Sequence, residues 1–145
     1  MAFQSIRLTR GISGRANLYP VTMRGYPDGR VSIYVSIDVA RHLKLTHKSK
    51  MEVEYDPESM RARLCKSHTG VACRAIQFFK IPKKERVKLK APTDPVAVKS
   101  DIRVSTETLK AIFGDFAATN LKSVMMVSGN IDFAENSATF CLIRN

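Results

Sequence analysis

Hydrophobic and polar residues alternate along much of the chain, which is the pattern of strands with one buried face. Residues 17–24 and 30–37 are rich in β-branched and aromatic side chains and flank a Pro-Asp-Gly turn sequence within 25–29. We therefore expect a β-hairpin at this point. The predicted inward residues of its second strand are Val31, Ile33, Val35 and Ile37.

Residues 51–65 predict a second hairpin, because apolar and charged residues alternate on both sides of a turn at 56–59. Its second strand should turn Met60, Ala62 and Leu64 inward. Between the two hairpins, Val39 and Leu43 lie four positions apart, which predicts a short helix over 38–45. A helix of about two turns is unstable alone, so we expect Leu43 to dock it on the strands.

The second part of the chain repeats this order of elements. A strand at 98–105 precedes a helix at 106–114, which Ser105 or Thr106 can cap and Gly114 can close. A strand at 121–127, a turn at 128–130 and a last strand at 139–143 complete the prediction. The stretch that begins at Val35 lies 69 residues before the one that begins at Val104.

Two such units in one chain would form a single-chain version of a symmetric dimer. The units predicted are 1–68 and 98–145, joined by a basic connecting segment, 69–97. Within that segment we expect a strand from Val71 to Phe79 and a lysine-protected edge strand over 80–91.

The charge of the chain is strongly positive and unevenly placed. There are 24 Lys and Arg against 13 Asp and Glu, a net charge of +11. Residues 1–100 carry +12 and residues 101–145 carry −1. This segregation indicates a polyanionic partner, and nucleic acid is the first expectation.

The stretch from Arg30 to Lys66 resembles the DNA-binding domain shared by AbrB-type transition-state regulators and MazE-type antitoxins. Residues 35–45 take the place of that family's strand end and helix, and residues 51–66 that of its closing hairpin. Asp38 stands where the family favours Glu, and Arg41 where it has a basic residue. The departures are Ser36 in place of Pro, Lys44 in place of Gly, and a Gly29-Arg30 pair that comes two residues early.

The resemblance implies interlocked β-hairpins that bind duplex DNA through arginines on the first strands and loops. MraZ-type regulators of this kind carry two copies in one chain, which fits the repeat. The predicted fold class is accordingly a β-rich α+β protein, with swapped-hairpin-like β-barrel units, two short helices and a pseudo-two-fold repeat. The predicted function is duplex DNA binding, as a transcriptional regulator.

The basic residues divide into two chemical kinds. All those before residue 44 are Arg, whose planar fork reads base edges or clamps phosphates, whereas 80–90 is rich in Lys, which attracts phosphates without regard to sequence. We expect the second half, with Arg103 and Lys110, to contribute little to binding. The candidate nucleic-acid-binding residues are Arg7, Arg10, Arg15, Arg24, Arg30, Lys80, Lys83, Lys84, Arg86, Lys88 and Lys90.

Two other kinds of partner stay open. Compact basic chains of this kind are frequent in phages, so the protein could be a phage-encoded inhibitor that docks on an acidic surface of a host protein. It could also bind RNA or single strands, because five aromatic residues offer stacking platforms. They are Tyr19, Tyr26, Tyr34, Phe78 and Phe79.

The sequence offers little for catalysis or metal binding. It has neither a phosphate-binding Gly-rich loop nor a nucleophile elbow, so we expect no enzyme activity and no cofactor. Cys65, His68 and Cys73 have the only metal-like spacing, yet a closed zinc site needs four ligands, so no metal is predicted. The odd number of cysteines argues for free thiols.

The hydropathy pattern of the sequence predicts neither a membrane span nor a secretion signal. No apolar run approaches the roughly 20 residues that span a bilayer, and the first residues contain no apolar signal core. We therefore expect a cytoplasmic protein without membrane contact, either a monomeric pseudo-dimer or a homodimer.

Overall fold

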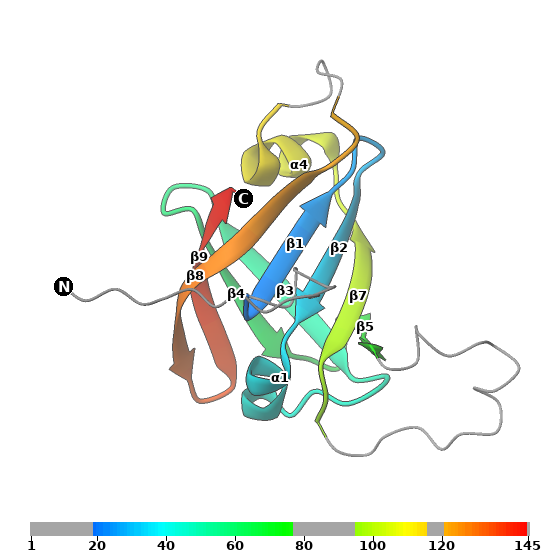
Figure 1. The fold of residues 1–145 in the computed structure, drawn as a ribbon, viewed down its shortest axis with the longest axis vertical. Helices are drawn as coiled ribbons and strands as arrows, with labels where there is room; N and C mark the ends of the chain where they lie inside the picture. The colour runs from blue at the N-terminus through cyan, green and yellow to red at the C-terminus, as the bar shows by residue number, and fades with distance from the viewer. Residues whose placement is uncertain (1–18, 77–94, 116–120, 145) are drawn as a thin grey trace, which may run out of the picture.

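The computed structural model describes residues 19–76, 95–115 and 121–144. Within them, nine strands form one antiparallel sheet in the order β5-β3-β4-β9-β8-β1-β2-β7-β6, which curls into a near-closed barrel (Figure 1). Helices α1 (Ile37–Leu43) and α4 (Thr106–Phe113) lie at opposite ends of it. The strands are β1 (Val21–Gly25), β2 (Arg30–Val35), β3 (Lys50–Asp56), β4 (Arg61–Lys66), β5 (Val71–Ala72), β6 (Arg74–Ala75), β7 (Val98–Arg103), β8 (Val124–Ala134) and β9 (Ser137–Arg144). The predicted β-rich α+β class is confirmed.

Strands β1 and β2 form the expected first hairpin. Gly29 has a φ of +92°, which suits glycine, and its N–H donates to the Tyr26 carbonyl at 3.0 Å. The inward residues Val31, Ile33 and Val35 are fully buried. The prediction for Ile37 is wrong, because helix α1 begins at this residue and ends the alternation, which leaves Ile37 39% exposed.

Both helices begin after a serine in extended conformation, and each buries one face. Ser105 caps α4 by accepting the Thr108 N–H at 3.2 Å, as predicted. Helix α1 buries Val39, Ala40 and Leu43, which confirms the apolar face expected from their spacing. Helix α4 packs its Phe113 ring onto Gly25 of β1, at a place where a Cβ would lie only 2.7 Å from the ring.

Strands β3 and β4 form the second hairpin with the predicted alternation in β3. Met51 is buried, and Glu52 and Glu54 point to solvent. The inward prediction for Met60 is wrong: it lies in the turn with a φ of +56° and is 40% exposed. The turn therefore extends one residue further than the alternation suggests.

The turn predicted at 128–130 is also wrong. These residues belong to β8, where a bulge shifts the pairing with β9 between Ser128 and Ile131. The reversal comes at 135–136 instead. The physical reason is a long-range contact, because the Ser128 hydroxyl accepts the Val21 N–H at 3.1 Å and holds this stretch in the sheet.

The two end strands of the sheet, β5 and β6, are consecutive in the chain and are separated by Cys73 alone. β5 pairs with β3, while β6 pairs with β7. Cys73 itself bonds to the loop before β3: its carbonyl accepts the Lys48 N–H at 2.8 Å, and its N–H donates to the Ser49 carbonyl at 2.7 Å. We call residues 71–75, with this loop, the seam of the barrel, since they join its two open edges.

His47 also ties the seam together. Its Nδ1 accepts the N–H of Ala75 in β6 at 3.1 Å. Burial lowers the pKa of His47, and the nearby charges of Lys48 and Arg74 lower it further. The neutral ring is therefore the form that the fold holds.

One hydrophobic core fills the barrel and draws on strands from distant parts of the chain. β2 pairs with β7, and β4 pairs with β9, so the strands of 1–68 and of 98–144 alternate within a single sheet. Phe140 and Met23 are the largest of the fully buried side chains. The edge strand predicted over 80–91 and residues 77–79 of the Val71–Phe79 strand lie outside the described residues.

Leu43 is 4% exposed and docks α1 on the core, so Leu43→Ala should lower the free energy of unfolding by about 2–5 kcal/mol. Ile37→Ala, on the exposed side of the same helix, is the control and should cost less than about 1 kcal/mol. Urea unfolding followed by circular dichroism measures both. Equal losses would contradict this orientation of the helix.

The seam should weaken as His47 becomes protonated. Its pKa in the folded protein lies below the ordinary value of 6.5, so the unfolded chain binds the proton more readily. The stabilisation from the neutral ring is complete above about pH 7 and is lost as the pH falls below 6.5. His47→Asn keeps an acceptor for the Ala75 N–H and does not titrate. Urea titrations should show wild-type stability falling more steeply than that of the variant between about pH 7 and pH 5; parallel curves would refute the role of His47.

Candidate nucleic-acid interface

The outer surface of β1, β2, β7 and β6 carries a group of cations. Buried residues alternate with outward ones in these strands, so the paired positions place the outward side chains in rows. In one row Arg30 lies opposite Arg103, and in another Lys99 lies between Tyr34 and Arg74. We call this surface the basic face; its cations are Arg24, Arg30, Arg74, Lys99 and Arg103.

The hairpin end of the basic face holds two arginines side by side. The Arg30 guanidinium lies 4.1 Å from the centre of the Tyr26 ring, a cation–π contact. Arg103 donates from Nη1 to the Asp28 carbonyl at 3.3 Å, and Val104 N–H to the Gly29 carbonyl at 2.9 Å ties β7 to the same turn. Both side chains belong to exposed residues, so the turn orients two guanidinium groups toward solvent.

Arg103 lies on the basic face, although it is not among the residues that the sequence analysis expects to bind. It lies in the part of the chain with net charge −1, and only the pairing of β2 with β7 brings it to Arg30. The predicted repeat was the available signal, because equivalent elements of two units related by a two-fold axis meet across that axis.

Arg24 differs from its neighbours because its guanidinium is engaged within the barrel. Nη1 donates to the Ser123 hydroxyl at 2.8 Å, and Nη2 lies 3.4 Å from the Met125 sulfur. The side chain is half-buried and joins β1 to β8 and the residues before it. Among the outward positions of these four strands, the one acid is Asp101, in the row of Arg24 and Ser32.

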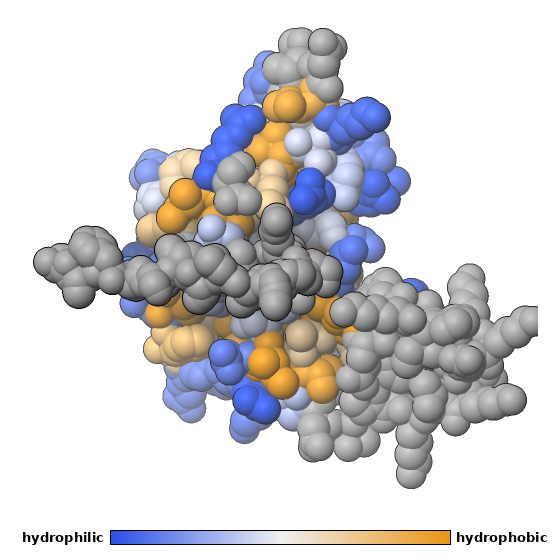
Figure 2. Space-filling model, in the orientation of Figure 1, coloured by the Kyte–Doolittle hydropathy of each residue, from blue (hydrophilic) through white to orange (hydrophobic). Residues whose placement is uncertain are grey.

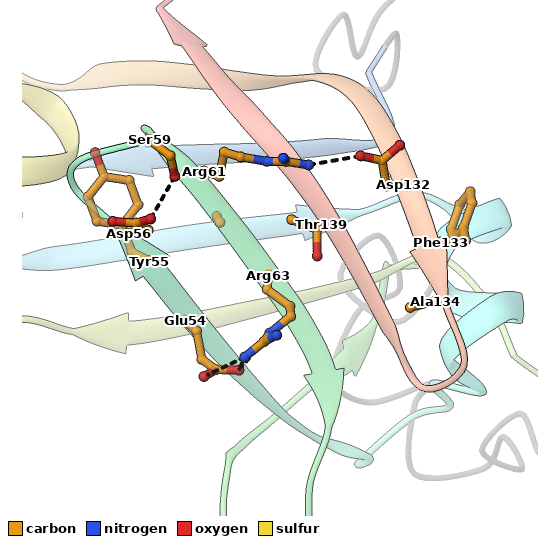
Figure 3. Close-up of a pocket in the computed structure, with 11 residues that line it drawn as sticks. Glu54, Tyr55, Asp56, Ser59, Arg61, Arg63, Asp132, Phe133, Ala134 and Thr139 are labelled. Atoms are coloured by element: carbon orange, nitrogen blue, oxygen red, sulfur yellow. Dashed lines mark hydrogen bonds and ion pairs between the residues drawn. The ribbon is translucent and has the colours of Figure 1, made fainter.

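The opposite surface, formed by β3, β4, β9 and the outer half of β8, is neutralised by ion pairs. Arg63 forms a two-pronged contact with Glu54, with both hydrogen bonds at 3.0 Å. Arg61 donates to Asp132 at 2.8 Å. These pairs line a groove of about 600 Å³ that also contains the half-exposed Phe133 (Figure 3). We call this surface the paired face.

Charge is thus divided between the two faces of the barrel. In the view of Figure 2, hydrophilic residues lie along the right side, by β2 and β7, and also at the upper left and at the lower left near α1. On the basic face five cations accompany one strand carboxylate, whereas Arg61 and Arg63 of β4 on the paired face are each held by an acid. A positive potential therefore extends from the basic face, and a polyanion is the ligand that it favours.

The other predicted binding residues lie outside the described part of the chain. They are Arg7, Arg10, Arg15, Lys80, Lys83, Lys84, Arg86, Lys88 and Lys90, together with Phe78 and Phe79 of the stacking set. Of the three described tyrosines, Tyr26 supports Arg30, and Tyr34 lies on the basic face beside Lys99. Tyr34 is half-buried, and burial raises its pKa.

The residues with metal-like spacing do not form a metal site. Cys65 is half-buried on β4, His68 is exposed in the turn after it, and Cys73 is buried at the seam. The described ranges contain no group of three or more His, Cys, Asp or Glu side chains that could hold a metal ion. No helix in the same ranges is long and apolar enough to cross a membrane.

Comparisons with family models, with curated proteins and with solved structures found no match for this chain.

The seam cysteine should resist alkylation as long as the barrel stays closed. Burial raises the pKa of the Cys73 thiol to about 11, so almost none of the reactive thiolate forms at pH 8. Cys141 is exposed and serves as the internal control. Mass spectrometry after iodoacetamide treatment should find Cys141 modified first and Cys73 modified only in denaturant. Similar rates at the two sites would show that the seam opens readily.

Proposed function

We propose that this protein binds duplex DNA through the basic face and acts as a transcriptional regulator. The observation that carries the proposal is the division of charge around the barrel: among the described residues, Arg30 and Arg103 form no ion pair on one face, whereas Arg61 and Arg63 are ion-paired on the other. Proteins that neutralise DNA phosphates present cations in this segregated way.

The dimensions of the basic face suit a duplex. Arg30 and Tyr34 are four residues apart on β2, so the row of Arg30 and Arg103 lies roughly 14 Å from that of Lys99 and Arg74. The major groove of DNA is about 12 Å wide. The two rows can therefore contact phosphates on both sides of one groove, which a single strand does not offer.

The arrangement of the strands supports a pseudo-two-fold repeat of the swapped-hairpin kind. The repeat makes β2 the counterpart of β7, β3 that of β8, β4 that of β9, and β1 that of the seam strands β5 and β6. If every strand is replaced by its counterpart, the order of the strands around the barrel stays the same. Val31 pairs with Ile102, and Ile33 pairs with Ser100. The residue 69 positions after Val31 is Ser100, and the one 69 positions after Ile33 is Ile102, so the repeat converts each of these pairs into the other. Each unit is then a hairpin, a short helix and a second hairpin.

The two substitutions that separate this chain from the AbrB-type pattern keep the backbone conformations of the residues they replace. Lys44, in place of Gly, ends α1 with a φ of +59° and a ψ of +42°, the left-handed conformation that glycine favours. Ser36, in place of Pro, has a φ of −68°, close to the value that a proline ring fixes. These conformations favour the proposed relationship.

The repeat also relates the two basic loops of the sequence. In the first unit, the turn 26–29 joins β1 to β2 and is followed directly by Arg30. In the second unit, the connection between β6 and β7 contains the lysine-rich residues 80–90. On this proposal, a basic sequence connects the strands at the equivalent point of both units.

Duplex binding should depend on the arginine pair of the basic face. In a fluorescence anisotropy titration, the logarithm of the affinity should fall with the logarithm of salt at about −0.9 per phosphate neutralised. Arg30→Gln with Arg103→Gln removes two contacts and should make this slope shallower by about 2. Arg61→Gln with Arg63→Gln removes the same charge from the paired face and is the control, expected to leave the slope unchanged.

The same titration separates the alternatives. No binding to duplex at about 50 mM salt, or equal losses in both double variants, would overturn the proposal. Tighter binding of a single-stranded oligonucleotide of equal length would favour an RNA or single-strand function. Circular dichroism must show that each variant remains folded.

A further inference from the structure

The seam contains a lysine in a conformation that lysine disfavours. Thr46–Ser49 form a β-turn in which the Ser49 N–H donates to the Thr46 carbonyl at 3.0 Å. Lys48, the third residue, has a φ of +75°, where glycine or asparagine is usual. A strained residue persists when the surrounding structure enforces it, and such residues gather at functional sites. The turn alone therefore does not explain why this position is a lysine.

Other cationic side chains surround this lysine. Lys48 and Arg74 lie close enough to His47 for their charges to act on its imidazole. Arg74 of β6 pairs in register with Lys99 of β7, and both point outward. Because the Nδ1 of His47 accepts a hydrogen bond from Ala75, the neutral ring carries its proton on Nε2 and is itself a donor.

Acids are scarce on the described segments that form this group. Residues 44–51 and 65–76, which form the loop and the seam strands with their approach, contain no Asp or Glu. The closest acids along the paired strands are Glu52, which directly follows Met51 of β3, and Asp101, two residues after Lys99 of β7. Glu52 accepts a hydrogen bond from Thr69 at 3.0 Å. Lys48 and Arg74 thus have no carboxylate on their own segments.

We propose that His47, Lys48, Arg74 and Lys99 together seat one phosphate group of the nucleic-acid backbone at the seam of the barrel. This seat rests on the proposed function and specifies where one end of the basic face holds the duplex. The seat lies at the row of Lys99 and Arg74, whereas Arg30 and Arg103 form the other row. It therefore contacts the DNA strand on the opposite side of the groove from Arg30 and Arg103. An anion explains why a lysine occupies the third position of the turn.

Two lysine-to-glycine variants test this seat, since two lysines of the described residues have a positive φ. Lys48→Gly and Lys44→Gly each remove one charge and relieve one left-handed lysine, so both should raise the melting temperature. Only Lys48→Gly should weaken duplex binding, with a salt slope shallower by about 0.9 and an affinity roughly 3- to 10-fold lower near 100 mM salt. A lysine with a purely structural role would not give higher stability together with weaker binding.

A second measurement separates this seat from the function on which it rests. Pyrophosphate added to the wild-type protein should shift the NMR amide signals of Lys48 and Arg74, and not that of Lys44. If duplex binding fails while these signals shift, the seat is supported for a phosphate ligand of another source, and DNA binding is refuted. If DNA binds but both lysine variants behave alike, or pyrophosphate leaves the seam signals unmoved, the seat is overturned.

Discussion

The closure of the barrel depends on two backbone hydrogen bonds at one residue. Cys73 accepts from the Lys48 N–H and donates to the Ser49 carbonyl, and it does so between two strands of only two residues each. Without this segment, β3 and β7 would each present a row of unpaired backbone groups. Such short strands have little stability of their own, so the burial of Cys73 and Ala75 must stabilise them.

Closure also determines which residues become neighbours on the surface. A barrel has one inside and one outside, so once the registers are set, the alternation in each strand fixes the direction of every side chain. Arg30, Arg74 and Arg103 come from separate parts of the chain and share a face only because β7 pairs with both β2 and β6. The division of charge is therefore a property of the strand pairing.

The local elements could be predicted from the sequence, because alternation, turn residues and helical spacing are local signals. The hairpins around 25–29 and 56–59 and the buried Leu43 show this. The bulge at 128–131 could not be predicted, since its Ser-Gly-Asn sequence is typical of a turn and the decisive contact with Val21 is long-range. The seam strands have only two residues each, which is too short for an alternation of apolar and polar residues to be recognised. The place of Arg103 beside Arg30 follows only from the pairing of β7 with β2.

The two ends of the basic face differ in chemistry although the proposed repeat makes their loops equivalent. At the hairpin end, Tyr26 and Asp28 orient the guanidinium groups of Arg30 and Arg103, and oriented forks suit directional contacts with bases or phosphates. At the seam end, Lys48 and Lys99 add point charges beside Arg74, and a point charge suits phosphate alone. Both ends draw residues from both halves of the chain. On the proposed function, the division of labour therefore runs along one face, between its ends, and the two units contribute to each.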